Sequence, residues 1–197
     1  MSEPNEPESL LESVDPNHLE LIGKVIIRFS ELEGWVAQLL RHYSGLETKA
    51  AYAITGGLRM RQILEMLPDV VRATQTNERL IDDILSIRVE LIAISEERDK
   101  VAHWQWMGSA GGWGVTKWLT ARKPAPMPEI TLYPKSQLKK LHSQMTRLVF
   151  RINAHLISDE EWMKLPKKNR DKFWPSPWRD TPLPQDPTPE ACHEDRK

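Results

Sequence analysis

Hydrophobic residues recur at intervals of three, four and seven along most of this chain, which is the spacing of helices that bury one face. The first such stretch begins at Asp15-Pro16, an N-cap followed by proline at the first helical position, and continues to about Gly45. It predicts a long amphipathic helix of about seven turns. Its core-facing residues are expected to be Leu19, Ile22, Ile26, Phe29, Val36, Leu40 and Tyr43.

Two shorter helical segments and a second long helix follow. Residues 48–54 form a short helical piece, and residues 58–71 form a helix that Pro68 is expected to kink or divide, because proline has no N–H to donate. The second long helix covers residues 77–102. Extending its seam by one turn reaches Arg98, and a charge at a position expected to be buried requires a partner or a function. The hydrophobic seam consists of Leu80, Ile84, Ile87, Leu91 and Ile94.

The period of the pattern changes to two after this helix. Residues 104–107 and 113–119 alternate on either side of a glycine-rich segment, which predicts a β-hairpin at about 104–120, with 129–133 as a candidate third strand. A last long helix begins at Ser136, with Leu138, Leu141, Met145, Leu148, Ile152 and Leu156 on its core face. The predicted fold is mainly α, a bundle of four to five helices with a small β-hairpin insertion before the last long helix.

One folded domain is expected over residues 14–157. Residues 1–13 are acidic and predict a flexible N-terminus, whereas residues 158–197 predict a short helix, opened by a capping box at Ser158, and a mobile proline-rich tail. No apolar run is long enough to span a membrane, and the N-terminus is acidic where a signal peptide would be basic. Because Cys192 is the single cysteine, we expect a cytoplasmic protein without a disulfide or a cysteine-rich metal site.

Charge is segregated along the chain, although the net charge is only −1. Residues 1–97 hold 9 Lys and Arg against 17 Asp and Glu, a net charge of −8, whereas residues 98–151 hold 10 against 2, a net charge of +8. Clustered cations gain binding free energy at phosphates through counterion release, so this basic block is a candidate surface for RNA. It can equally dock onto the acidic helices of its own fold or of a second copy. Both interpretations stay open.

The segment from Glu97 to Trp104, between the second long helix and the hairpin, carries the residues best suited to chemistry. Arg98 offers a planar permanent cation for a phosphate, and His103 titrates near neutral pH and can move a proton. These groups suffice to cleave RNA without a metal. Asp99, one turn before His103, is placed to orient the imidazole. On an ideal helix Arg98 and His103 lie about 140° apart, so we expect them to converge only if the helix frays or a second subunit contributes.

Arg98-Asp99 and His103 at the end of a long helix resemble the Arg-polar-x(3–5)-His motif of the HEPN superfamily (higher eukaryotes and prokaryotes nucleotide-binding domains). The resemblance covers about residues 15–157 and is closest to the RN-x-x-AH-x-x-W branch, although Asp99 replaces the commoner Asn and Trp104 a frequent Gly. It implies a helical homodimer with catalytic Arg98 and His103 and accessory Asp99. It also implies a metal-independent endoribonuclease of toxin–antitoxin or phage-defence type, with an antitoxin protein as partner and no cofactor.

Cationic and aromatic residues around the motif are candidates for RNA binding: Lys100, Trp104, Trp106 and Lys117. The tryptophans can stack on unpaired bases, or they can pack against the bundle or a second copy. The competing interpretation of the motif is structural, with Arg98 paired to an acid such as Glu33 and His103 capping its helix. The protein would then be a non-catalytic homodimeric interaction module. Three further helical histidines are expected at the surface or its boundary: His42, His142 and His155.

Overall fold

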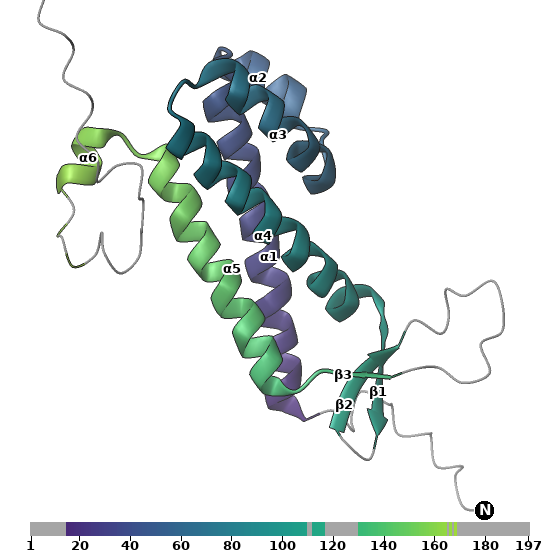
Figure 1. Cartoon of the computed structure of the whole chain (residues 1–197). Helices are drawn as coiled ribbons and strands as arrows, with labels where there is room; N and C mark the ends of the chain where they lie inside the picture. The colour runs from purple at the N-terminus through teal and green to yellow at the C-terminus, as the bar shows by residue number, and fades with distance from the viewer. Residues whose placement is uncertain (1–14, 110–111, 117–129, 165, 167, 169–197) are drawn as a thin grey trace, which may run out of the picture.

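The computed structural model describes residues 15–109, 112–116, 130–164, 166 and 168, and shows a helical bundle with a small antiparallel sheet at one end (Figure 1). Three long helices, α1, α4 and α5, form the bundle, and α3 packs against α1 and α4 at the end away from the sheet. This confirms the mainly helical fold with a hairpin before the last long helix. The helices are α1 (Pro16–Ser44), α2 (Thr48–Thr55), α3 (Met60–Thr74), α4 (Glu78–His103), α5 (Lys135–Leu156) and α6 (Asp159–Lys164). The strands are β1 (Gln105–Ser109), β2 (Gly112–Thr116) and β3 (Thr131–Leu132).

Several sequence predictions concern segments outside the described residues: the N-terminus over 1–13, the proline-rich tail, and the part of the hairpin that includes Lys117. The short helix predicted after the bundle is present as α6. Ser158 opens it with the expected capping box, because its Oγ accepts from the Glu161 N–H at 3.2 Å while the Glu161 carboxylate accepts from the Ser158 N–H at 3.0 Å. None of the described helices combines the length and apolar character that a membrane span requires.

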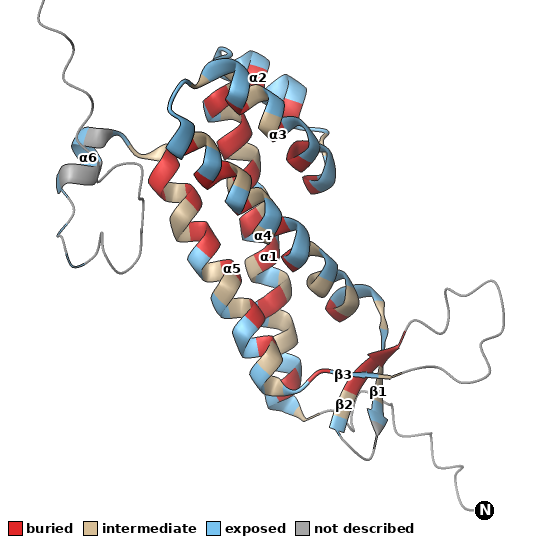
Figure 2. Ribbon diagram, in the orientation of Figure 1, coloured by how far each residue is buried: buried red, intermediate tan, exposed pale blue. Residues whose placement is uncertain are grey.

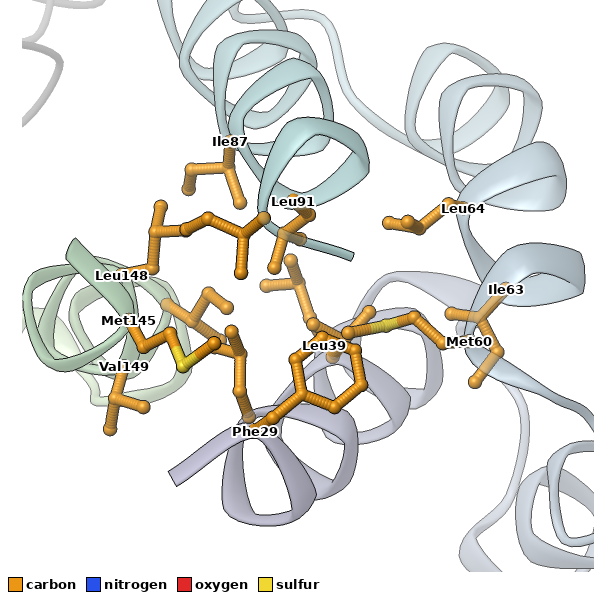
Figure 3. Packing of buried hydrophobic residues seen from close by; sticks show 14 of the residues in the cluster. Phe29, Leu39, Met60, Ile63, Leu64, Ile87, Leu91, Met145, Leu148 and Val149 are labelled. Carbon is orange, nitrogen blue, oxygen red and sulfur yellow. The ribbon is translucent and has the colours of Figure 1, made fainter. Parts of the chain in front are cut away.

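Side chains from α1, α3, α4 and α5 form one hydrophobic core (Figures 2 and 3). The α4 seam is buried from Leu80 to Ile94, as predicted. On α1 the predicted residues Phe29, Val36, Leu40 and Tyr43 are buried, and Ile22 and Ile26 are half-buried. Leu19 is 39% exposed, whereas Val25 and Leu32, which the predicted stripe omits, are fully buried. Spacings of three and four fit two adjacent stripes on a helix, and the neighbouring helices decide which stripe is covered.

Pro68 lies inside α3, and the helix runs through it from Met60 to Thr74 without being divided. Proline cannot donate to the carbonyl four residues before it, which here belongs to Leu64. Arg88 of α4 supplies the missing donor, because its Nε lies 2.6 Å from the Leu64 carbonyl oxygen. The arginine satisfies the carbonyl that the proline leaves unpaired, and it also joins α3 to α4.

A buried polar network connects α1, α4 and α5. The Asp83 carboxylate accepts hydrogen bonds from Arg151 Nη2 at 2.5 Å and from His155 Nε2 at 2.8 Å, and Arg151 also binds Glu90 at 2.7 Å. The other ring nitrogen of His155 lies 2.9 Å from the Tyr43 hydroxyl. The His155 side chain is 0% exposed, so the prediction that it lies at the surface or its boundary is wrong. Burial raises the pKa of Asp83, but hydrogen bonds from His155 and Arg151 lower that pKa further, and it lies below its usual value.

The three strands pair antiparallel in the order β1, β2, β3, and they are anchored to the end of α4. Trp106 of β1 donates from its indole Nε1 to the Val101 carbonyl of α4 at 2.9 Å. Its ring also meets the buried His18 ring of α1 edge to face, with 5.3 Å between centroids. The sheet therefore fixes the segment that directly follows His103.

Candidate active site

Arg98 lies where the core seam of α4 reaches the edge of the bundle. Its guanidinium carbon is 4.4 Å from the centroid of the Phe29 ring on α1, which is a cation–π contact, and its side chain is 21% exposed. The Nε atom is buried and has no hydrogen-bond partner among the described residues. The aromatic ring thus supports one face of the guanidinium, and Nη1 contacts the polar residues that follow on the helix.

The Arg98 and His103 side chains meet although the helix is intact. α4 continues to His103, and Arg98 Nη1 lies 3.4 Å from Nε2 of the exposed imidazole. The expectation that their convergence requires a frayed helix or a second subunit is therefore wrong, because the long arginine side chain spans the angle between the two positions. Arginine has no acceptor, so a hydrogen bond forms here only when Nε2 carries a lone pair and the ring proton is on Nδ1.

Asp99 contacts the arginine. Its Oδ1 accepts a hydrogen bond from Arg98 Nη1 at 3.0 Å. The carboxylate therefore orients the guanidinium, whereas the sequence predicted that it would orient the imidazole. The alternative ion pair between Arg98 and Glu33 is not formed, since Glu33 has no polar contact with any described residue. Trp104 is half-buried and leaves His103 exposed, so the bulky residue after the motif does not close off the imidazole.

A cleft opens beside this pair, between α1, α3 and α4. Its volume is about 880 Å³, within the range of roughly 300–1,000 Å³ that is typical of ligand sites. Arg98 and Asp99 line it, together with apolar side chains such as Phe29 and Ile92 and the carboxylate of Glu33. The motif therefore borders a cavity that is lined by both apolar and polar side chains.

The other predicted RNA-binding side chains that the structure describes do not line this cleft. Lys100 donates to the Glu97 carboxylate at 2.5 Å. The Trp106 ring packs edge to face on Tyr133 with 6.0 Å between centroids, and Trp104 packs against the core. These two tryptophans thus pack against the bundle, which is the second of their two interpretations. Lys117 lies outside the described residues.

Part of the basic block binds acidic residues of the same chain. Four of its described cations form ion pairs with acids from residues 1–97, which supports the intramolecular interpretation of the charge segregation. Such pairs leave less positive charge available for a polyanion. The pairs are Lys100 with Glu97, Lys135 with Asp15, Arg147 with Glu90, and Arg151 with Asp83 and Glu90.

Glu97 and Tyr133 form a contact that no sequence spacing indicates, since they lie 36 residues apart. The buried Tyr133 hydroxyl donates to the Glu97 carboxylate. Burial, and then the adjacent Glu97, raise the pKa of the Tyr133 hydroxyl, which therefore stays protonated. Burial raises the pKa of Glu97, but hydrogen bonds from Lys100 and Tyr133 lower that pKa further, so the carboxylate stays ionised. The contact ties the last turns of α4, and with them Arg98, to the segment that precedes α5.

Within the described ranges, no group of three or more His, Cys, Asp or Glu side chains is arranged to hold a metal ion. No family model, curated protein or solved structure matches this chain. The function is therefore inferred from the motif and the geometry around it.

Proposed function

We propose that this protein binds single-stranded RNA at the Arg98–His103 pair and cleaves it as a metal-independent, HEPN-like endoribonuclease. The observation that supports the proposal is the 3.4 Å contact between a supported guanidinium and an exposed imidazole at the edge of a cleft. One group is suited to hold a phosphate, and the other to move a proton at the same phosphodiester.

In this reaction, neutral His103 takes the proton of a ribose 2′-hydroxyl, O2′ attacks the adjacent phosphorus, and the bond from phosphorus to O5′ breaks. O5′ takes a proton from the imidazolium or from water, which leaves a 2′,3′-cyclic phosphate and a 5′-hydroxyl. Arg98 donates to the phosphate oxygens as their negative charge increases. Phe29 and Asp99 position the guanidinium, so that little reorganisation is needed when the phosphate arrives.

We also propose that the protein acts as a homodimer that pairs along the outer face of α4. Val89 is 63% exposed and precedes His103 by fourteen residues, a spacing that places the two on one stripe along the same side of the helix. A second copy that covered this stripe would bring two Arg98–His103 pairs to one groove.

The test is incubation of the purified full chain with single-stranded RNA in EDTA. We expect fragments with 2′,3′-cyclic phosphate ends. Arg98→Ala and His103→Ala should each lower the rate by at least about 100-fold, as expected for loss of a general base or of a charge-stabilising group. Two matched controls, Arg72→Ala on the last turn of α3 and His142→Ala on α5, should cleave at the wild-type rate.

Cleavage that survives both motif substitutions would contradict the assignment. A wild-type protein that neither cuts RNA nor retards it in a gel at low salt, yet sediments as a dimer, would instead support the non-catalytic interaction module.

A further inference from the structure

The cleft beside Arg98 contains a carboxylate that contributes no hydrogen bond or ion pair to the described fold. Glu33 is half-buried on α1 and lines the cleft, but it makes no hydrogen bond or ion pair with any described residue. Of the other cleft carboxylates, Glu65 binds Arg61 at 3.0 Å and Asp99 binds Arg98, whereas Glu96 on α4 has no partner among the described residues. Both oxygens of the Glu33 carboxylate are therefore available to accept hydrogen bonds from a ligand in the cleft.

Glu33 lies one helical turn from the residue that supports the guanidinium. Phe29 precedes it by four residues, about 6 Å along the helix axis, and the Phe29 ring carries Arg98. A phosphate held by Arg98 would therefore leave the attached nucleoside close to Glu33. Ile92, which is 37% exposed, adds apolar surface to the same cleft, against which a planar base can pack.

The four RNA bases differ in what they offer to a carboxylate, which can only accept hydrogen bonds. Guanine has two adjacent donors on its Watson–Crick edge, N1–H and the N2 amino group, and these match the two carboxylate oxygens. Adenine and cytosine have one amino group beside a ring nitrogen that is an acceptor, and uracil has one N–H between two carbonyl acceptors. An acceptor facing a carboxylate is repelled, so Glu33 favours guanine.

We propose that the cleft between α1, α3 and α4 binds a guanine base, with Glu33 as the specificity-determining residue and the 3′-phosphate of that nucleotide at Arg98. The inference rests on the proposed function, because the phosphate is placed by the Arg98–His103 pair. It adds the substrate class: RNA with guanosine on the 5′ side of the cleaved bond.

The test is calorimetric titration of the full chain, in EDTA, with the 3′-monophosphates of guanosine, adenosine, cytidine and uridine. We expect guanosine 3′-monophosphate to bind at least about tenfold more tightly than the other three, as a bidentate base contact provides. Glu33→Gln replaces one acceptor with a donor at nearly the same volume and should remove this preference. The matched control is Glu31→Gln, an exposed residue of the same helix that pairs with Arg28, and it should keep the preference.

Equal affinity for the four nucleotides, binding of none of them, or a guanosine preference that survives Glu33→Gln would each overturn the inference. These outcomes are separate from those for the proposed function. Selective binding of guanosine 3′-monophosphate without RNA cleavage supports the guanine site and contradicts the nuclease. Cleavage of RNA after all four nucleotides, with no selective binding, supports the nuclease and contradicts the guanine site.

Discussion

Replacing Asp83 with alanine should destabilise the fold more than any other single change to a polar group in the bundle. Asp83 is 5% exposed and accepts from both Arg151 and His155, so its removal leaves two buried donors without their acceptor. Breaking a buried ion pair from one side costs about 3–5 kcal/mol. Arg151 keeps Glu90 and is 17% exposed, which places the expected loss near the lower limit, about 3 kcal/mol.

The loss can be measured by urea titration followed by circular dichroism, and a domain of this size should also melt about 10 °C lower. Asp82→Ala is the matched control, because Asp82 is the exposed neighbour on the same helix and its removal should change stability by less than about 0.5 kcal/mol. If Asp83→Ala unfolds at the wild-type urea concentration, or if Asp82→Ala loses as much, the network does not stabilise the bundle as described.

The same network determines how stability depends on pH. The folded-state pKa of Asp83 lies below its unfolded value, so ionised Asp83 contributes stability above the unfolded pKa of about 3.9, and this contribution is lost as pH falls through the folded pKa. The stability difference between wild type and Asp83→Asn should decrease as pH falls below about 4. A difference that grows on acidification would contradict the lowered pKa.

Two further predictions concern the backbone. Arg88→Met should destabilise the protein by about 1–2 kcal/mol, because it leaves the Leu64 carbonyl unpaired. This loss should largely disappear in a Pro68→Ala background, where a backbone N–H can replace Arg88 as the donor. Equal losses of unfolding free energy in both backgrounds, measured by urea titration, would contradict the pairing. Gly114→Ala should destabilise the protein by about 1–3 kcal/mol, because the new Cβ would lie 2.5 Å from Ile130 Cγ2. Gly23→Ala should stabilise it by about 0.5–1 kcal/mol, because a Cβ at this position of α1 meets open space. Melting temperatures of the two variants that move in the same direction would contradict this.

The hydrophobic pattern was enough to predict the long helices, because each must bury one face at a spacing close to 3.6 residues. The α4 seam and the hairpin after it illustrate this success. The pattern placed most of the α1 stripe correctly, but it included the exposed Leu19 and omitted the buried Leu32, because two adjacent stripes satisfy the same spacing. The choice between them depends on where the other helices pack, which a local pattern does not contain.

Polar pairs between distant segments were beyond sequence reasoning. Asp83 and His155 lie 72 residues apart, and neither has a local sign that it is buried. In the candidate site, the sequence predicted Arg98 and His103 as the reactive pair but did not predict their direct contact. An ideal helix fixes the positions of their Cβ atoms and not how far an arginine side chain extends. The contact between Phe29 and Arg98 could have been predicted from the sequence, since both residues lie on the core-facing seams of helices expected to pack together.

The central claim, that Arg98 and His103 act together on a ribose phosphodiester, is tested most directly with a DNA strand that contains a single ribonucleotide, a guanosine. The claim predicts that the protein, in EDTA, cuts this strand only on the 3′ side of the ribonucleotide and leaves a guanosine 2′,3′-cyclic phosphate end, and that Arg98→Ala and His103→Ala abolish the cut. Cleavage of the corresponding all-deoxy strand, or cleavage at the ribonucleotide by either variant at the wild-type rate, would contradict it.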